Sequence, residues 1–557
     1  MTPRCPILGI KMPTHLVNLD ALIQREDFES GDVVSGAGEP LFKLEELESK
    51  RMYFKTLRKP DFQRQTADWS PQMIVGLIKS FLDGELIPAL ILWHSKTTGK
   101  IFVIDGSHRL SALIAWVNDD YGDGAISRDF FAYNVNPAQA RFHTITQKLM
   151  ADAVGTYREL YFAANSVNAD ESSIKVRRGR TITTRLLSIQ KVEGDASVAE
   201  KSFFTINQNP ATISPTELTV IQARHKPNAI ATRALISAGT GHKYWGKLPK
   251  AAEIEALSRS AYDLLFGKIV EIESQTPDLP RAGQPYSAEA FAMLLDMVNI
   301  FNDVTPAMWQ QGEKRQRKSK SLIPILQDES DGTTTLQFLE RIKSVAALIT
   351  GNAYPGSLGF DPAVYSYAST GKFHPSAFIA SLKLAKELDE KNKLIEFSDV
   401  RSDFEEFLVR HKFFISALAH GKGGRMRPLQ SLLKMHWIVL DCLWAGMKDD
   451  NQIIVRLNAD PQLRDLPRES PESDGSPTRR RFSKSVQAAG ILRDTLANRA
   501  RCQECGARLP PSARSKDHIE REQDGGIGTL ENLRFTHPFC NTGYREAKRA
   551  RAMKGGV

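Results

Sequence analysis

The chain has 557 residues, 41% of them hydrophobic and 25% charged, with a formal net charge of +9 at pH 7. This composition is typical of a globular protein with roughly three or four domains. No run of about 18 apolar residues is present, and the first residues lack the apolar core of a secretory signal. We therefore expect a cytoplasmic protein with no membrane partner.

The first part of the chain has two sections. Residues 1–45 show weak periodicity and many Gly, Pro and acidic residues, so we expect a loosely structured lead-in. From 46 to 225 helix and strand signals alternate, which predicts an α/β domain. The predicted helices span 70–86 and 108–117, and the predicted strands span 89–93 and 101–105. The second strand, Gly106 and the second helix form a strand–loop–helix unit.

The middle of the chain, from 226 to 465, is mostly helical in pattern, and a linker rich in Pro, Ser and charge follows at 466–484. The predicted helices span 335–349, 375–391 and 429–447. The stretch 239–247 has the letters of a P-loop without its spacing, so we expect a loop there. Residues 485–557 form a small C-terminal domain, and the predicted fold class is multidomain α+β.

The C-terminal segment carries the whole basic excess of the chain. Residues 479–557 contain 17 Lys and Arg against 8 Asp and Glu, whereas residues 1–478 contain 57 of each sign. A basic segment of this kind fits a phosphate backbone, although a solvated basic tail would have the same composition.

Two pairs of metal-ligating residues lie within this segment. Three of the five cysteines fall here, as Cys502-x-x-Cys505 and as Cys540, which follows His537 by three residues. Two residues between ligands let one tight turn present both side chains to a tetrahedral Zn²⁺, and Gly506 suits such a turn. The sequence therefore predicts a structural zinc site, against the alternative of reduced cysteines that lie together by chance.

A second constellation lies between and just after these pairs. Hydrolysis of a phosphodiester needs an activated water and stabilisation of the charge on the leaving oxygen. His518 can take a proton near neutral pH, and Asn532 can orient its imidazole. Asp517 and Asn541 offer the oxygen ligands that a hard cation such as Mg²⁺ or Mn²⁺ prefers. A lone Asp-His pair more often lies on the surface without a chemical role, but this pair stands beside the cysteines in a basic segment.

The order C-x-x-C, D-H-I, G-G, N-L and C-N resembles the HNH, or ββα-metal, endonuclease family over about 45 residues. The spacing of 14 residues from His518 to Asn532, then 9 to Asn541, is similar to that in the HNH domain of CRISPR effector nucleases. The resemblance implies a general base at His518, a catalytic Mg²⁺ or Mn²⁺ on Asp517 and Asn541, and a positioning role for Asn532.

The same resemblance implies a ββα-metal fold with a zinc knuckle and a final helix, here 543–554, that lies against DNA. Two departures from the family pattern are visible. His537 stands where a cysteine is commoner, and an acidic stretch, 520–524, precedes the glycine pair. The acidic stretch bears on substrate approach rather than on chemistry.

The strand–loop–helix unit places Ser107, His108 and Arg109 at the start of a helix. Free N–H groups and the helix dipole favour an anion there, and Arg109 adds a bidentate phosphate donor. Taken alone, a corner with Asp105, Gly106 and an arginine is more often structural than functional.

With two further strings, 58–64 and 203–218, this corner resembles the ParB/sulfiredoxin-like N-terminal domain of GmrSD- and SspE-type restriction proteins over about 170 residues. The shared features are Pro60 to Arg64, Trp69, Asp105 to Arg109, and Asn207 with Glu217. The resemblance implies an NTP-binding domain that senses modified DNA. Its nucleotide-binding residues would be Arg64, Asp105, Gly106, His108 and Arg109. Ser107 replaces the usual Gln, which weakens the case for hydrolysis more than the case for binding.

We therefore expect a restriction or anti-phage endonuclease whose HNH site is gated by the N-terminal domain. Its partners would be DNA, including modified phage DNA, and a nucleotide, and the sequence is compatible with an oligomer. Isolated residues 485–557 should bind DNA weakly and cut it poorly. Two alternatives remain: a non-catalytic, nucleotide-switched DNA-binding regulator, and an RNA-directed nuclease, because the phosphodiester is common to both nucleic acids.

Overall fold

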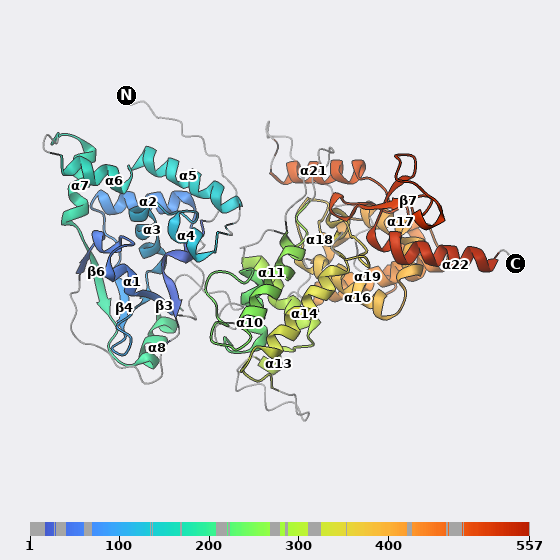
Figure 1. The fold of residues 1–557 in the computed structure, drawn as a ribbon, viewed down its shortest axis with the longest axis horizontal. Coiled ribbons are helices and arrows are strands. Elements are labelled where there is room, and N and C mark those ends of the chain that lie inside the picture. Colours follow the sequence, from blue (N-terminus) through green and yellow to red (C-terminus); the bar gives the residue numbers. More distant parts are fainter. Residues whose placement is uncertain are drawn as a thin grey trace. The chain divides into compact units, whose positions relative to one another are not determined.

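The computed structural model divides the chain into two compact units (Figure 1). Unit 1 is Met1–Arg224 with Thr240–Gly246, and unit 2 is His225–Gly239 with Lys247–Val557. None of the helices in the described ranges is long and apolar enough to cross a bilayer. The structure describes residues 17–26, 28, 41–60, 69–133, 135, 137–166, 170–207, 220, 223–267, 279–283, 288–309, 325–351, 354–419, 426–463, 466, 482 and 484–555.

Unit 1 is built on a mixed six-stranded sheet with the order β1-β3-β5-β4-β6-β2. The neighbours β1, β3 and β5 run parallel, so their carboxyl ends meet at one edge of the sheet. The strand β4 is antiparallel to β5 and parallel to β6, and β2 closes the sheet antiparallel to β6. The strands are β1 (Gln24–Glu26), β2 (Leu41–Lys43), β3 (Leu57–Pro60), β4 (Leu90–His94), β5 (Ile101–Asp105) and β6 (Leu186–Lys191).

Helices cover both faces of this sheet. Alternating side chains of β4 and β5 point to opposite faces, so Leu92 and Val103 join the larger core while Trp93 and Phe102 join a smaller one. The larger core lies under α2, α3 and α5, and the smaller one lies under α8 (Figure 1). The helices are α1 (Met52–Thr56), α2 (Pro71–Leu82), α3 (Ser107–Asn118), α4 (Ala125–Phe130), α5 (Pro137–Ala153), α6 (Tyr157–Ala164), α7 (Ile174–Thr184) and α8 (Ala196–Asn207).

The strand–loop–helix unit is confirmed: β5 ends at Asp105, and α3 begins at Ser107. The helix predicted over 70–86 ends earlier, at Leu82, because Gly84 adopts a positive φ of 87° and closes the helix. Within the expected loosely structured lead-in, 1–45, the described residues include the short strands β1 and β2. Strands of three residues are too short to show alternation and form only by pairing with β3 and β6.

Unit 2 contains the helical middle of the chain. The helices predicted over 335–349, 375–391 and 429–447 correspond to α14, α16 and α19. The stretch 239–247, most of which belongs to unit 1, forms turns and bends, as predicted. The helices are α10 (Pro227–Ile236), α11 (Ala251–Phe266), α12 (Ala288–Phe301), α13 (Pro306–Trp309), α14 (Thr333–Ala347), α15 (Pro362–Tyr365), α16 (Pro375–Glu390), α17 (Leu394–Arg410), α18 (Phe413–Ala419), α19 (Met426–Trp444), α20 (Asp450–Asn458) and α21 (Lys484–Asn498).

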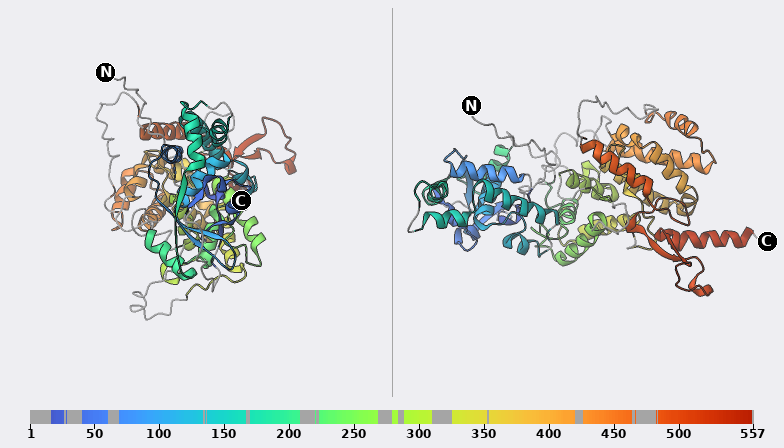
Figure 2. Two further views of the ribbon diagram at one scale, coloured as in Figure 1. Left: turned by 90° about the vertical axis from the view of Figure 1, so that its left-hand side faces the viewer. Right: turned by 90° about the horizontal axis from the view of Figure 1, so that it is seen from above.

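The C-terminal segment forms a small ββα element within unit 2. The strands β7 (Ser515–His518) and β8 (Leu533–Thr536) make an antiparallel hairpin, and α22 (Arg545–Gly555) lies beside it (Figure 2). A π-helical turn, Cys540–Tyr544, leads into α22, so the helix predicted over 543–554 begins as a wider turn. The predicted fold class, mixed α+β with a ββα element, is confirmed.

This ββα element packs on the helical body. The Phe539 amide donates to the Ser357 carbonyl at 2.9 Å, and the Tyr544 hydroxyl donates to Asp399 of α17 at 2.9 Å. Arg551 of α22 also pairs with Asp399, at 2.7 Å. The regions predicted as separate helical and HNH domains therefore share one compact unit. The predicted linker 466–484 lies outside the described residues except at Leu466, Phe482 and Lys484.

Candidate functional site

The two predicted ligand pairs meet in one buried cluster. The side-chain ligand atoms of Cys502, Cys505, His537 and Cys540 all lie within 4.8 Å of one another. The His537 Nδ1 atom is 3.5 Å from the Cys505 sulfur and 3.8 Å from the Cys540 sulfur. Ligands at about 2.0–2.3 Å from a tetrahedral ion stand roughly 3.5–3.8 Å apart, so the cluster has the size of a Zn²⁺ cage.

The orientation of His537 suits a metal ligand. Its Nε2 atom lies 2.9 Å from the Arg508 carbonyl oxygen. Because a carbonyl oxygen can only accept a hydrogen bond, Nε2 carries the hydrogen, and the unprotonated Nδ1 faces the sulfurs. Gly506 has a φ of 73° and closes the knuckle, as its position predicts. Hydrogen bonds from the neighbouring Cys505 and Cys540 thiols hold the pKa of Cys502 well below its ordinary value, which favours the thiolate that binds metals.

A buried ionic network fixes the cluster to the helical body. Arg401 of α17, fully buried, donates to Glu405 at 2.8 Å and to the Leu358 carbonyl at 2.6 Å. Glu405 also accepts from the Tyr365 hydroxyl at 3.1 Å and from the Arg508 amide, next to the knuckle, at 2.8 Å. Burial opposes the charge on Arg401, but Glu405, Tyr365 and the cluster cysteines together outweigh it and hold the Arg401 pKa above its ordinary value.

A second buried pair anchors the helix that precedes the knuckle. The Arg499 Nε atom, just after α21, donates to Asp361 at 2.7 Å, and both side chains are fully buried. Gly359, two residues before Asp361, has a φ of 56°, and a Cβ there would lie 3.2 Å from the His537 ring. The loop 354–361 therefore forms one wall of the metal cluster.

The hairpin holds Asp517 between two arginines. Asp517 lies directly opposite Arg534 in the β7–β8 register, and the Arg534 Nε donates to Asp517 Oδ2 at 2.7 Å. Arg545, the first residue of α22, pairs with the other carboxylate oxygen of Asp517 and donates to the Ile519 carbonyl at 3.1 Å. The Asp517 side chain is only 3% exposed, so both oxygens have cationic partners in a buried position.

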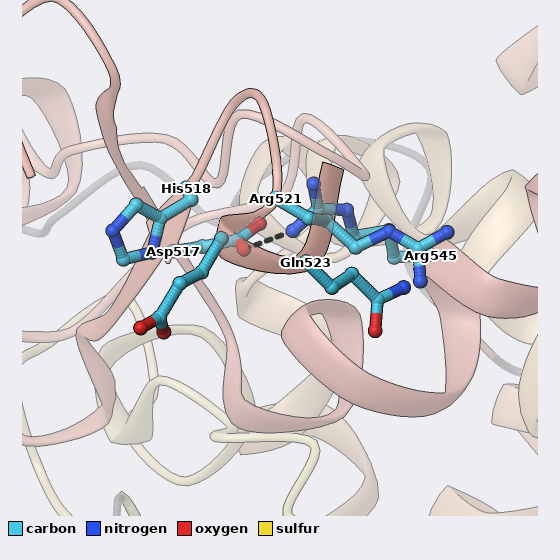
Figure 3. Close-up of a pocket in the computed structure, with 6 residues that line it drawn as sticks. Asp517, His518, Arg521, Gln523 and Arg545 are labelled. Atoms are coloured by element: carbon cyan, nitrogen blue, oxygen red, sulfur yellow. Dashed lines mark hydrogen bonds and ion pairs between the residues drawn. The ribbon is translucent and has the colours of Figure 1, made fainter. Parts of the chain in front are cut away.

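An open pocket of about 470 Å³ lies where β7 ends, and we call it the His518 pocket. The His518 ring and the Arg545 guanidinium lie on opposite sides of Asp517 (Figure 3). The remaining lining residues are Arg521, Glu522 and Gln523. The pocket thus brings together an imidazole, two acids and two cations beside a partly buried strand end.

Asn532 fixes the loop that follows His518. Its side-chain oxygen accepts from the Glu520 amide at 2.7 Å, and its amide donates to the carbonyls of Glu520 and Ile527 at 3.0 and 2.8 Å. Among the contacts of the described residues none joins Asn532 to the His518 ring. An effect of Asn532 on the imidazole would therefore act through the loop backbone.

Asn541 is anchored on the same strand as Asp517. Its amide donates to the Ser515 hydroxyl at 2.9 Å and to the Lys516 carbonyl at 3.1 Å. These bonds use the nitrogen and leave the side-chain oxygen without a protein donor among the described residues. The Asp517 carboxylate and the Asn541 amide oxygen are suitable ligands for Mg²⁺ or Mn²⁺. The cation could bind Asp517 only if Arg545 or Arg534 released one of its carboxylate oxygens.

The residues that the sequence analysis missed are the partners of Asp517. Arg534 is visible only from the antiparallel register, and Arg545 only from the fold of the turn before α22. Other basic side chains of the C-terminal segment also have acidic partners, which cannot be deduced from the net charge of the segment. Lys548 pairs with Glu504 at 3.0 Å, and Arg549 lies 3.6 Å from Asp524.

The predicted nucleotide corner lies at the carboxyl edge of the parallel strands. Arg109 pairs with Asp105 at 2.9 Å across one helical turn and donates to the Pro88 carbonyl at 3.2 Å. Gly106 has a φ of 91°, and a Cβ there would lie 2.5 Å from the Leu90 side chain. The corner therefore requires glycine for both conformation and space.

The other predicted residues of this corner are placed only in part. His108 stacks on Trp69, with ring centroids 6.0 Å apart and an interplanar angle of 24°. Arg64 and Glu217 lie outside the described residues, as does the side chain of Asn207. The structure thus brings Asp105, Gly106, His108 and Arg109 together and leaves Arg64 a prediction.

The same edge holds a buried triad that the sequence analysis did not identify. Lys59, fully buried, pairs with Asp20 at 2.9 Å, and Arg25 pairs with the same carboxylate. Burial lowers the pKa of Lys59 to about 8, against the opposing attraction of Asp20. Burial also opposes ionisation of Asp20, but Arg25 and Lys59 together hold its pKa well below the ordinary value.

Comparison with known families gives two matches. Residues 44–224 match the family described as GmrSD restriction endonuclease, N-terminal domain, and residues 502–546 match the family described as HNH endonuclease. No curated protein and no solved structure matches the chain. Both predicted resemblances are confirmed, and the chain is a restriction-type nuclease rather than a non-catalytic regulator.

Proposed function

We propose that this nuclease, which joins a GmrSD-type N-terminal domain to an HNH domain, cuts DNA at the His518 pocket in response to a signal read by unit 1. One observation carries the assignment of the site: Asp517 and His518 line one pocket where β7 ends, and the Asn541 amide is anchored to Ser515 and Lys516 of the same strand. A nuclease site requires a base and an acidic metal ligand at such short range.

His518 is the proposed general base. No side chain within the described residues hydrogen-bonds to its ring, so the imidazole can accept a proton from a water in the pocket. The backbone on both sides of it is fixed, by the β7–β8 ladder before it and by the Asn532 bonds to Glu520 after it. A base held in this way needs little reorganisation when the water is deprotonated.

Asp517 and Asn541 are the proposed ligands of a catalytic cation. A bound Mg²⁺ or Mn²⁺ would stabilise the negative charge that develops on the phosphate and on the leaving oxygen. Asn541 contributes a fixed oxygen, because both hydrogen bonds of its side-chain amide anchor the nitrogen to β7. The Cys502, Cys505, His537 and Cys540 cluster is the proposed structural zinc site, which holds the turn before α22.

Unit 1 is the proposed sensor. Support comes from the match of residues 44–224 to the GmrSD N-terminal domain and from the corner of Asp105, Gly106, His108 and Arg109 at the carboxyl edge of parallel strands. Such edges are the usual place for ligands in α/β sheets. The ligand of this corner would be a nucleotide phosphate, and the DNA target would carry a base or backbone modification.

The test of the catalytic assignment is cleavage of supercoiled plasmid with Mg²⁺ or Mn²⁺. We expect His518→Ala to lower the rate about 10²- to 10⁴-fold, the usual contribution of a general base. His225→Ala is the matched control, because His225 is an exposed histidine of the same unit. Equal rates for wild type and His518→Ala, with zinc content unchanged, would place the chemistry elsewhere.

The test of sensing is a panel of phage genomes with different base or backbone modifications, each with and without NTP. We expect cleavage to depend on the modification, the nucleotide or both, and Arg109→Ala to remove that dependence. An RNA arm belongs in the panel, because the phosphodiester chemistry is common to both nucleic acids. Faster cleavage of RNA than of every DNA would overturn the DNA assignment.

A further inference from the structure

Asp517, the proposed metal ligand, is surrounded by more positive charge than its single negative charge can neutralise. One buried carboxylate faces two guanidinium groups, and both side-chain oxygens are engaged. A divalent cation that binds Asp517 must enter this already cationic site. Glu522, the other acid of the pocket, pairs with neither arginine among the described contacts, so both guanidinium groups oppose the binding of a divalent cation at Asp517.

The two arginines are not equivalent. Arg534 has a second acidic partner, Glu504, which also pairs with Lys548 at 3.0 Å. Arg545 has the Ile519 carbonyl as its only other partner among the described contacts. Arg534 therefore keeps an acidic partner when Asp517 is shared with a metal, whereas Arg545 loses its counter-charge.

The position of Arg545 gives it an alternative partner. It lines the His518 pocket, on the side of Asp517 opposite to His518 (Figure 3). A phosphate held in this pocket would present oxygens to a guanidinium that can bind them with two parallel hydrogen bonds. The same phosphate would supply the negative charge that a divalent cation needs beside Arg534 and Arg545.

We propose that Arg545 is a positioning residue that couples metal binding to substrate binding. It holds Asp517 while the pocket contains no phosphate, and it moves to the scissile phosphate when DNA and the cation enter together. The enzyme would thus bind its catalytic cation weakly in the absence of DNA. This inference rests on the proposed catalytic role of Asp517.

The test measures Mn²⁺ binding by the EPR signal of free Mn²⁺ in titrations of the full chain, loaded with zinc. Every protein carries His518→Ala so that DNA stays intact. We expect a duplex that wild type cuts to lower the Mn²⁺ Kd at least about tenfold, within the usual range for coupling between two ligands. Asp517→Asn should abolish the DNA-dependent binding, which locates it in the pocket.

Arg545→Gln should bind Mn²⁺ at least about fivefold more tightly than the parent when no DNA is present, and it should gain little from DNA. Arg549→Gln is the matched control, because it removes one charge from the same helix without touching Asp517. It should leave the DNA-free Kd nearly unchanged. Zinc content and thermal unfolding report whether each variant is folded.

The inference is overturned if the parent binds Mn²⁺ equally well with and without DNA, which needs no Arg545 variant. It is also overturned if folded Arg545→Gln behaves like Arg549→Gln. In either case cleavage by wild type would leave the proposed function intact. Absence of Mn²⁺ binding under all conditions, together with absence of cleavage, would instead remove the proposed function.

Discussion

The two predicted sites each pair an aspartate with an arginine, but in opposite settings. At the corner of unit 1, Asp105 and Arg109 are four residues apart, and their side chains are 34% and 16% exposed. At the His518 pocket, Asp517 is 3% exposed and is held by arginines from another strand and another helix. An exposed pair can exchange partners with a ligand at little cost, whereas a buried pair exchanges partners only when an incoming charge replaces the one that leaves.

The settings differ because the two sites are assembled differently. The corner of unit 1 is made by one strand, one glycine and one helical turn, so neighbouring residues suffice. The C-terminal site depends on distant anchors, since Glu405 and Asp361 lie about 100 residues or more before their partners. We therefore expect unit 1 to tolerate changes at its site, and unit 2 to lose structure when its anchors are removed.

The largest effect should follow loss of the metal cage. Cys502→Ser removes one ligand of a site in which structural zinc contributes on the order of 10 kcal/mol in small domains. We expect loss of zinc, loss of nuclease activity and a lower unfolding temperature for unit 2. Metal analysis and calorimetry are the measurements.

Cys442→Ser is the control for this change, because Cys442 is a buried cysteine of α19 outside the cluster. It should retain zinc and activity. If Cys502→Ser keeps both zinc and activity, the C-terminal site does not depend on its metal cluster. The proposed difference between this site and the corner of unit 1 would then be wrong.

A smaller effect should follow removal of the buried anchor Glu405. Glu405→Gln leaves Arg401 buried without its counter-charge, and breaking such pairs costs about 3–5 kcal/mol. Glu406→Gln changes a neighbouring acid that is 31% exposed and should cost less than about 1 kcal/mol. Denaturant titration of both variants tests the difference, and equal costs would show that the anchor is not what stabilises unit 2.

The same anchors sharpen the expectation for isolated residues 485–557. Without the helical body, Arg499 loses Asp361 and the Arg508 amide loses Glu405. Two buried polar groups would then be exposed at the base of the cage, and the knuckle would lose its support. The segment remains predicted to cut poorly, and the contacts supply a physical reason for it.

Local patterns accounted for much of this organisation. The ligand pairs, the Asp-His step and the strand–loop–helix unit each depend on short-range spacing, and the structure brings their described residues together. The Arg545–Asp517 pair depends on how a π-helical turn aims α22, and spacing does not encode this. The anchors Asp361 and Glu405 have no local signature, and the three-residue strands β1 and β2 form only by pairing.

The smallest effect on stability should follow Arg109→Ala. The lost ion pair is partly exposed, so we expect a cost of about 1 kcal/mol or less. Arg128→Ala, which removes another surface ion pair of unit 1, is the matched control, and both variants should unfold near the wild-type temperature. Only Arg109→Ala should weaken nucleotide binding, measured by calorimetry on the full chain. Suppose instead that Arg109→Ala lowers the free energy of unfolding by more than about 2 kcal/mol and leaves nucleotide binding unchanged. The role of the corner would then be structural, because Arg109 would bind the Pro88 carbonyl and Asp105 rather than a ligand.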